Sequence, residues 1–127
     1  MNSMISRRAL VAAAASLPAF GRAGAASQPL RIGCLTDLNG PYADLVGQGT
    51  IASIKLAIED FAKLHPDIPV ELLVADFGLK PDTGLAIMRD WFDQRGVHAI
   101  IDVPLSALAL AAVSVLESKN KVGLFTS

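Results

Sequence analysis

The stretch LRIGCLTDLNGPYADL, residues 30–45, decides the fold of this chain. Residues 30–36 favour a β-strand that ends on a small hydroxyl residue, and the turn-forming residues Asp37, Asn39, Gly40 and Pro41 follow it. A helical pattern begins within about ten residues of these turn formers. Strand, open loop and helix are the first unit of an α/β sheet, in which the loop at the carboxyl end of a strand is the usual place for a ligand.

The first 26 residues have the pattern of an export signal. Arg7 and Arg8 precede an apolar run over residues 9–20, and small residues follow at positions 24–26, which predicts a secretory signal peptide over residues 1–26. The run is shorter than the roughly 20 residues that span a bilayer, and it lacks the amphipathic pattern of a first domain helix. Residues 6–10, SRRAL, resemble a twin-arginine signal except at Leu10, where that signal prefers phenylalanine. We favour the twin-arginine route, with the general secretory route as the alternative.

The remaining chain, residues 27–127, is acidic and holds one small domain. Removal of Arg7, Arg8 and Arg22 lowers the 11 basic residues to 8 against 12 acidic ones, so the net charge falls from −1 to −4. This charge argues against a surface for nucleic acid or an anionic membrane. Cys34 is the single cysteine, so an internal disulfide is excluded, and we expect the thiol to be buried as a small hydrophobe.

Strands and helices alternate along the domain. We expect strands at 30–36, 70–75, 97–103 and 122–125, and helices at 50–64, 81–95 and 105–118. In the first helix Ile51, Ile54, Ile58 and Phe61 fall on one face, and Gly96 stands where a glycine ends a helix. This β-α-β-α-β-α-β pattern predicts a parallel sheet flanked by helices, with the first and third strands as candidates for its switch point. Because the sequence stops as the fourth ligand-facing loop opens, we expect a truncated chain.

Ser106 is the candidate anion-binding residue that the sequence itself indicates. It follows Pro104 at the carboxyl end of the third strand and opens a helix whose nearest acid is Glu117, at the far end. A helix start without a built-in anion attracts an anionic ligand. A plain helix cap is the alternative role for this serine, and the residues alone leave both open.

The remaining polar residues do not form a recognisable catalytic or metal site. Asp37, Asp76 and Asp102 each end a strand, as in an acidic receiver-type pocket, but no matching lysine accompanies them. We expect Asp76 and Asp102 to cap loops and helix starts. Neither His65 nor His98 has metal-ligand spacing, and phosphate-binding glycine motifs are absent from the sequence. We therefore expect neither an enzyme nor a bound cofactor or metal ion.

Four segments carry a family resemblance: GPYADLVGQG before the first helix, ADFGLKPD before the second, DVPLSA before the third and KNKV before the last strand. In this order the mature chain resembles periplasmic solute-binding proteins of ABC transporters, of the branched-chain amino-acid (leucine/isoleucine/valine-binding) type. The resemblance implies the first half of the N-terminal lobe of a type I periplasmic binding protein. It also implies a periplasmic receptor that delivers a small carboxylate, either an amino acid or an aromatic or aliphatic acid, to an ABC permease. A ligand-sensing domain of a signalling protein and a truncated exported enzyme are the alternatives.

The same resemblance implies positions for the ligand. The hydroxyl of Ser106 and the backbone N–H groups of Ala107 and Leu108 would bind the carboxylate. Tyr42 would lie near the other end of the ligand. Further contacts would come from the loop after the fourth strand, of which Thr126 and Ser127 are the first residues. The sequence departs from amino-acid binders in two respects: apolar residues follow Ser106 where those proteins have hydroxyl residues, and a cysteine pair is absent.

Overall fold

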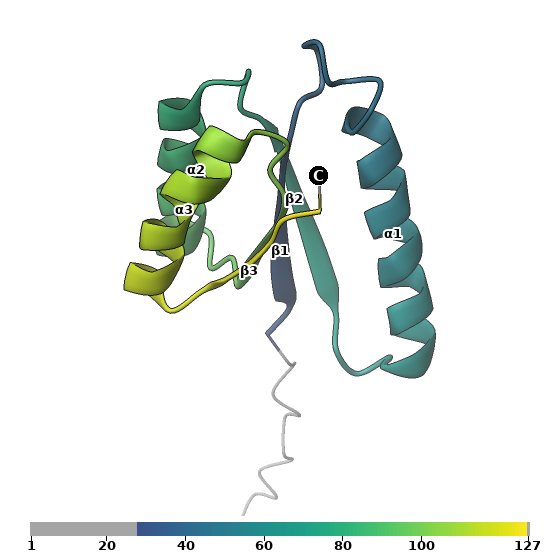
Figure 1. Ribbon diagram of the computed structural model, residues 1–127. Helices are drawn as coiled ribbons and strands as arrows, with labels where there is room; N and C mark the ends of the chain where they lie inside the picture. The colour runs from purple at the N-terminus through teal and green to yellow at the C-terminus, as the bar shows by residue number, and fades with distance from the viewer. Residues whose placement is uncertain (1–27, 127) are drawn as a thin grey trace, which may run out of the picture.

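A four-stranded parallel sheet lies at the centre of the computed structural model, which describes residues 28–126. The predicted signal peptide, residues 1–26, and the predicted ligand residue Ser127 lie outside this range. Helix α1 covers one face of the sheet, and α2 and α3 lie together on the other (Figure 1). The predicted α/β alternation is confirmed. In chain order the elements are β1 (Leu30–Thr36), α1 (Gly47–Leu64), β2 (Val70–Asp76), α2 (Pro81–Gln94), β3 (Ala99–Asp102), α3 (Ser106–Lys119) and β4 (Val122–Leu124).

The strand order is β2-β1-β3-β4, so β1 has a parallel neighbour on each side. Its pairing with β2 begins where Leu30 lies opposite Val70. Its pairing with β3 ends where Leu35 lies opposite Asp102. The chain leaves β1 toward one edge of the sheet and returns past it to β3. Since parallel strands are joined by right-handed crossovers, these opposite directions place α1 and α2 on opposite faces. The predicted switch point between β1 and β3 is confirmed.

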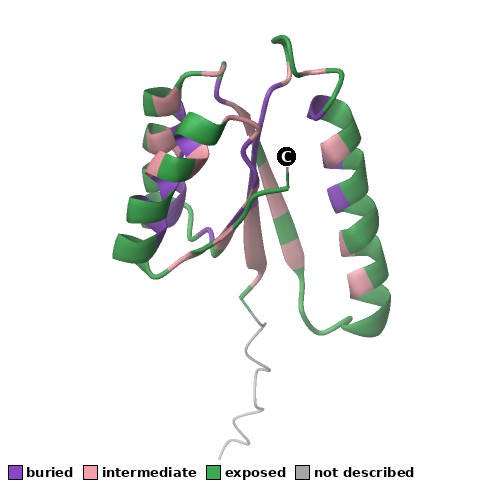
Figure 2. Cartoon of the chain, viewed as in Figure 1, coloured by how far each residue is buried: buried purple, intermediate pink, exposed green. Residues whose placement is uncertain are grey.

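The densest core lies between the sheet and the pair α2 and α3, where Figure 2 shows most of the buried segments. Two glycines permit this close packing. A Cβ at Gly33 would lie 2.4 Å from ring atoms of Trp91, and one at Gly84 would lie 2.3 Å from Cδ2 of Leu108. The indole therefore lies directly on β1, and α3 lies directly on α2. These contacts fix the position in which α3 begins.

The face under α1 is less completely filled. Ile51 and Ile54 of α1 are buried, but Ile58 and Phe61, on the same predicted face, are only half-buried. A groove of about 640 Å³ runs between α1 and the sheet, and Leu124 of β4 contributes to its wall. Within residues 28–126, α1 and the other helices fall short of the length and apolar character needed to cross a bilayer.

Two elements, α1 and β3, have a boundary that lies more than one residue from its predicted position. Helix α1 begins at Gly47, before the predicted start at residue 50, because the missing side chain lets the helix approach the Asp37 carbonyl; a Cβ there would lie 3.1 Å from that oxygen. Strand β3 is shorter than the predicted 97–103. Gly96 has a φ of 63°, and the Val97 N–H donates to the Trp91 carbonyl at 3.0 Å, so Val97 completes the end of α2. Val103, with a φ of 78°, already belongs to the following turn.

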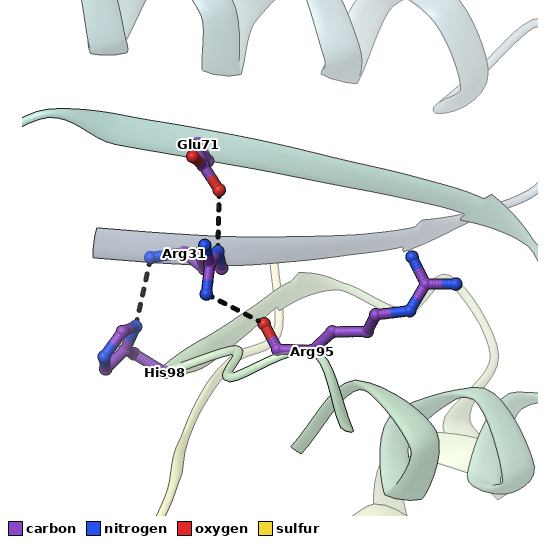
Figure 3. A network of polar contacts seen from close by, with 4 residues as sticks. All are labelled: Arg31, Glu71, Arg95 and His98. Atoms are coloured by element: carbon purple, nitrogen blue, oxygen red, sulfur yellow. Dashed lines mark hydrogen bonds and ion pairs between the residues drawn. The ribbon is translucent and has the colours of Figure 1, made fainter. Parts of the chain in front are cut away.

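A polar network joins three elements at the amino-terminal edge of the sheet (Figure 3). Nε of Arg31 donates to Glu71 of β2 at 2.6 Å, and its Nη1 donates to the carbonyl of Arg95, after α2, at 3.3 Å. The Arg31 backbone N–H donates to Nδ1 of His98 at 3.0 Å, which extends the pairing of β1 with the chain before β3. The ion pair is partly solvated and contributes roughly 0–1 kcal/mol. This network lies at the edge opposite the strand ends where ligands are expected.

Candidate functional site

The candidate site lies at the carboxyl ends of β1 and β3, which are adjacent in the sheet. From this point the chain continues toward α1 on one face and toward α3 on the other (Figure 1). In an open α/β sheet, the loops at such a switch point separate and leave a crevice between them. The candidate site is therefore built from the loop after β1, the loop after β3 and the first turn of α3.

The loop after β1 is organised by Asp37. This side chain is fully buried. Its Oδ1 accepts the backbone N–H of Gly40 at 2.8 Å, and its Oδ2 accepts that of Tyr42 at 2.9 Å. A buried carboxylate needs such donors, because an isolated charge is strongly disfavoured in the interior. Asp37 thus closes the turn that the sequence predicts after the first strand.

A second carboxylate links this loop to the end of β2. Asp76 Oδ1 accepts the Gly78 N–H at 2.8 Å, and its Oδ2 accepts Nδ2 of Asn39 at 3.0 Å. The Gly78 N–H, followed by the Asn39 amide, holds the pKa of Asp76 below its usual value. The prediction that Asp76 caps a loop is confirmed.

Ser106 is the first residue of α3, and its side chain is exposed. The N-cap position belongs to Leu105, and the described residues provide no side-chain hydrogen bond that caps this helix. Ser106 therefore does not occupy the N-cap position that the alternative role would give it. The absence of an acid from the first turn, expected from the sequence, is confirmed.

The next two predicted residues differ in exposure. Ala107 is exposed, whereas the side chain of Leu108 is fully buried against Gly84 of α2. Only the backbone of Leu108 is thus available to a ligand. The helical hydrogen bonds begin with the Ala109 N–H donating to the Leu105 carbonyl at 2.9 Å. The N–H groups of the first three helical residues precede this bond, so the helix itself does not supply acceptors for them.

Tyr42 and Thr126 lie on different parts of the molecule. Tyr42 is in the loop after β1, at the predicted edge of the sheet, and its side chain is 41% exposed. Thr126 follows β4 and lines the apolar groove under α1. The lining of that groove includes neither Ser106 nor Tyr42. The strand order thus brings the loop of Tyr42 and the start of α3 to the carboxyl edge of the sheet. Thr126 belongs instead to the groove under α1.

The ends of β1 and β3 at the candidate site are buried. Cys34 and Thr36 of β1 are fully buried, and Asp102 of β3 is 1% exposed. Burial, followed by the nearby Asp102 carboxylate, raises the pKa of Cys34 to about 12, so the thiol stays protonated. The prediction that Cys34 is a buried small hydrophobe is confirmed.

Asp102 does not cap the start of α3, which corrects the expectation for this residue. Asp102 and Val103 both have a φ of 78°, and the N-cap of α3 is Leu105. Leu105, rather than Asp102, thus stands at the N-cap position of α3.

The described part of the chain contains no cluster of three or more histidine, cysteine, aspartate or glutamate residues that could hold a metal ion. His65 ends α1, where its ring centroid lies 4.6 Å from that of Phe61, and His98 belongs to the network at the opposite edge. Each of these two side chains thus makes a contact within the fold.

Sequence reasoning missed the role of Asp37, which it considered only as part of an acidic pocket. A signal was present, because an aspartate before turn formers often accepts hydrogen bonds from backbone N–H groups a few residues later. The sequence did not show that both of its oxygens would be used within one loop.

Comparisons with known proteins agree with this geometry. The family description periplasmic binding protein matches residues 29–127. A branched-chain amino acid ABC transporter periplasmic ligand-binding protein from Burkholderia xenovorans LB400 is 42% identical, with a TM-score of 0.73, over 77% of this chain and 26% of its own. A periplasmic binding protein from Burkholderia mallei is 36% identical, with a TM-score of 0.70, over 75% of this chain and 25% of its own.

An ABC transporter substrate-binding protein from Sphaerobacter thermophilus is 28% identical, with a TM-score of 0.67, over 76% of this chain and 26% of its own. The chain thus spans about a quarter of the length of these three proteins. A comparison with curated proteins finds no match. The matched family consists of solute-binding receptors of the periplasm rather than enzymes. Because the family match extends over nearly all of the described domain, this chain belongs to the periplasmic binding protein family.

Proposed function

We propose that this chain is the first part of the N-terminal lobe of an exported receptor for a small carboxylate-bearing solute. The solute is an amino acid or an aromatic or aliphatic acid, and an ABC permease is the partner that takes it up. The start of α3 is the observation that carries this proposal. Ser106 is exposed at the first helical position, and the first turn contains no acid. Backbone amides at a helix start favour an anion.

In the proposed complex each residue has a separate role. The Ser106 hydroxyl and the N–H groups of Ala107 and Leu108 donate to the carboxylate, and Tyr42 contacts the rest of the solute. Thr126 and Ser127 begin a loop that adds contacts from the side of β4. Hydrogen bonds to a charged group contribute roughly 1.5–3 kcal/mol each. A few such bonds suffice for micromolar affinity when water is excluded from the site.

The proposed route to the periplasm begins with residues 1–26 as a cleaved signal peptide. The twin-arginine route is favoured because Arg7 and Arg8 stand together before the apolar run. The permease as partner is supported by the relatives described as ABC transporter proteins.

A chimeric receptor tests the ligand class. Residues 28–126 replace the matching quarter of the Burkholderia xenovorans protein, and calorimetry compares benzoate with benzamide and leucine with leucinamide. Each amide keeps the shape of its acid and removes the negative charge. If α3 binds the carboxylate, at least one acid binds, and its amide binds roughly 10- to 100-fold more weakly. Equal binding of acid and amide by the folded chimera would contradict the carboxylate site.

The isolated 127-residue chain provides the complementary test. Receptors of this architecture close two lobes around a ligand, and this chain spans about a quarter of its relatives. We therefore expect the isolated chain to bind the same acids only weakly, with a broad thermal transition because one sheet face is incompletely covered. Sub-micromolar binding of benzoate or leucine by the monomer would show that the chain is a self-sufficient binding domain.

A further inference from the structure

Asp37 has an unusual position for an acid, because it is fully buried directly after β1. Both carboxylate oxygens are used by backbone donors of one loop, Gly40 at 2.8 Å and Tyr42 at 2.9 Å. The second donor is the N–H of the one tyrosine of the chain. The side chain of Asp37 therefore acts on the backbone that carries Tyr42.

The surroundings of Asp37 leave the loop little freedom. A Cβ at Gly40 would lie 2.6 Å from both oxygens of the Asp37 carboxylate, so the loop backbone lies tightly against it. On the other side, Gly47 at the start of α1 packs against the Asp37 carbonyl. The bond from Asn39 to Asp76 holds the middle of the loop to the end of β2. The loop is thus attached to β1, β2 and α1 at once.

We propose that Asp37 is the positioning residue of the ligand loop, and that it fixes where Tyr42 lies at the carboxyl edge of the sheet. The contact of Tyr42 with solute rests on the proposed function, but the fixing of the loop does not. A carboxylate is required because two N–H donors need two acceptor oxygens. Asparagine offers one acceptor oxygen and, at the other position, an amide that is itself a donor.

Fluorine NMR of the isolated chain tests this directly. Because Tyr42 is the single tyrosine, 3-fluorotyrosine gives a resonance from this side chain alone. In the wild-type chain we expect one resonance with a defined shift. In Asp37→Asn we expect a shift toward that of the denatured chain, or several resonances. Asp44→Asn, the same change at an exposed acid of the same loop, is the matched control and should leave the spectrum unchanged.

Amide exchange supplies a second measurement that does not depend on a variant that folds well. In the wild-type chain the Gly40 and Tyr42 amides should be protected, and Asp37→Asn should accelerate their exchange by roughly 10- to 100-fold more than that of core amides. A methyl group at position 40 would clash with the Asp37 carboxylate. Gly40→Ala should therefore also accelerate exchange at these two amides, and should do so much less in a variant that already carries Asp37→Ala.

Three results would overturn the proposal. The first is exchange of the wild-type Gly40 and Tyr42 amides at the rate of the unfolded chain. The second is an unchanged fluorotyrosine spectrum in a folded Asp37→Asn variant. The third is a uniform acceleration at all amides, which would make Asp37 a contributor to global stability only. None of these measurements uses a ligand, so their outcome is independent of the carboxylate test.

Discussion

Replacement of Ser106 separates a ligand-binding role from a structural one. The serine is exposed at the first position of α3, and the described residues give its side chain no capping hydrogen bond. Ser106→Ala therefore removes no known bond of the fold, and the free energy of unfolding should change by less than about 0.5 kcal/mol. For a domain of this size, about 1 kcal/mol corresponds to roughly 4–8 °C in Tm. The expected shift is thus no more than about 2–4 °C.

Ser106→Asp should separate stability from binding. A negative charge in the first helical turn stabilises a helix by roughly 0.3–1 kcal/mol, so the Tm should stay the same or rise. The same carboxylate would occupy the amides that the solute needs and would repel its charge. In the chimeric receptor we therefore expect Ser106→Asp to abolish binding. Ser106→Ala should weaken it by roughly 10- to 100-fold, through loss of one hydrogen bond to a charged group.

The assay pairs thermal unfolding with calorimetric titration of benzoate and leucine. Ser114→Ala is the control, because Ser114 is also an exposed serine of α3 but lies beyond the first turn; it should leave affinity unchanged. A Ser106→Asp variant that binds as tightly as wild type would refute the anion site. A large loss of Tm in Ser106→Ala that aspartate restores would show that the serine caps the helix after all.

Three further predictions concern the core, the thiol and export. Gly33→Ala places a methyl group 2.4 Å from the Trp91 ring, so chemical denaturation should show that the free energy of unfolding falls by roughly 1–3 kcal/mol. An unchanged denaturation midpoint would mean that the ring moves freely. Burial raises the pKa of Cys34 to about 12, so iodoacetamide at neutral pH should label it only after unfolding, and rapid labelling of the folded chain would contradict this. Changing Arg7 and Arg8 to lysine should block export by the twin-arginine route, and nearly unchanged export would indicate the general secretory route. Mass spectrometry of the wild-type protein should find an N-terminus near residue 26 or 27; the intact chain in the cytosol would refute a signal peptide.

Regular features of the fold were predictable because they follow from local periodicity. Ile51 and Ile54 fall on one helical face in the sequence, and both are buried in the structure. The bounds of the helices and strands were less predictable where the backbone adopts a conformation that the residue type does not favour. Gly47 is a poor helix former, yet it begins α1 because its lack of a side chain permits contact with the Asp37 carbonyl. Val103 favours a strand, yet it has a positive φ.

The candidate site was predictable only in part. The uncharged start of α3 is a property of consecutive residues, so the sequence showed it. The N-cap depends on the turn that joins β3 to α3, and that turn places Leu105 rather than Ser106 at the cap. The role of Asp37 depends on how its loop folds back, which brings Gly40 and Tyr42 to the two oxygens of one carboxylate.

The apolar groove under α1 is a poor place for the proposed solute. The polar side chains among its lining residues are the hydroxyls of Thr50, Ser53 and Thr126, and its other lining residues are apolar and uncharged. A carboxylate that enters such a groove loses its hydration without gaining a cation or a set of backbone amides, which disfavours binding by several kcal/mol. At the start of α3 the backbone amides supply donors in place of water. We therefore expect the solute at the edge of the sheet, between the loop that Asp37 holds and the first turn of α3, rather than in the groove under α1.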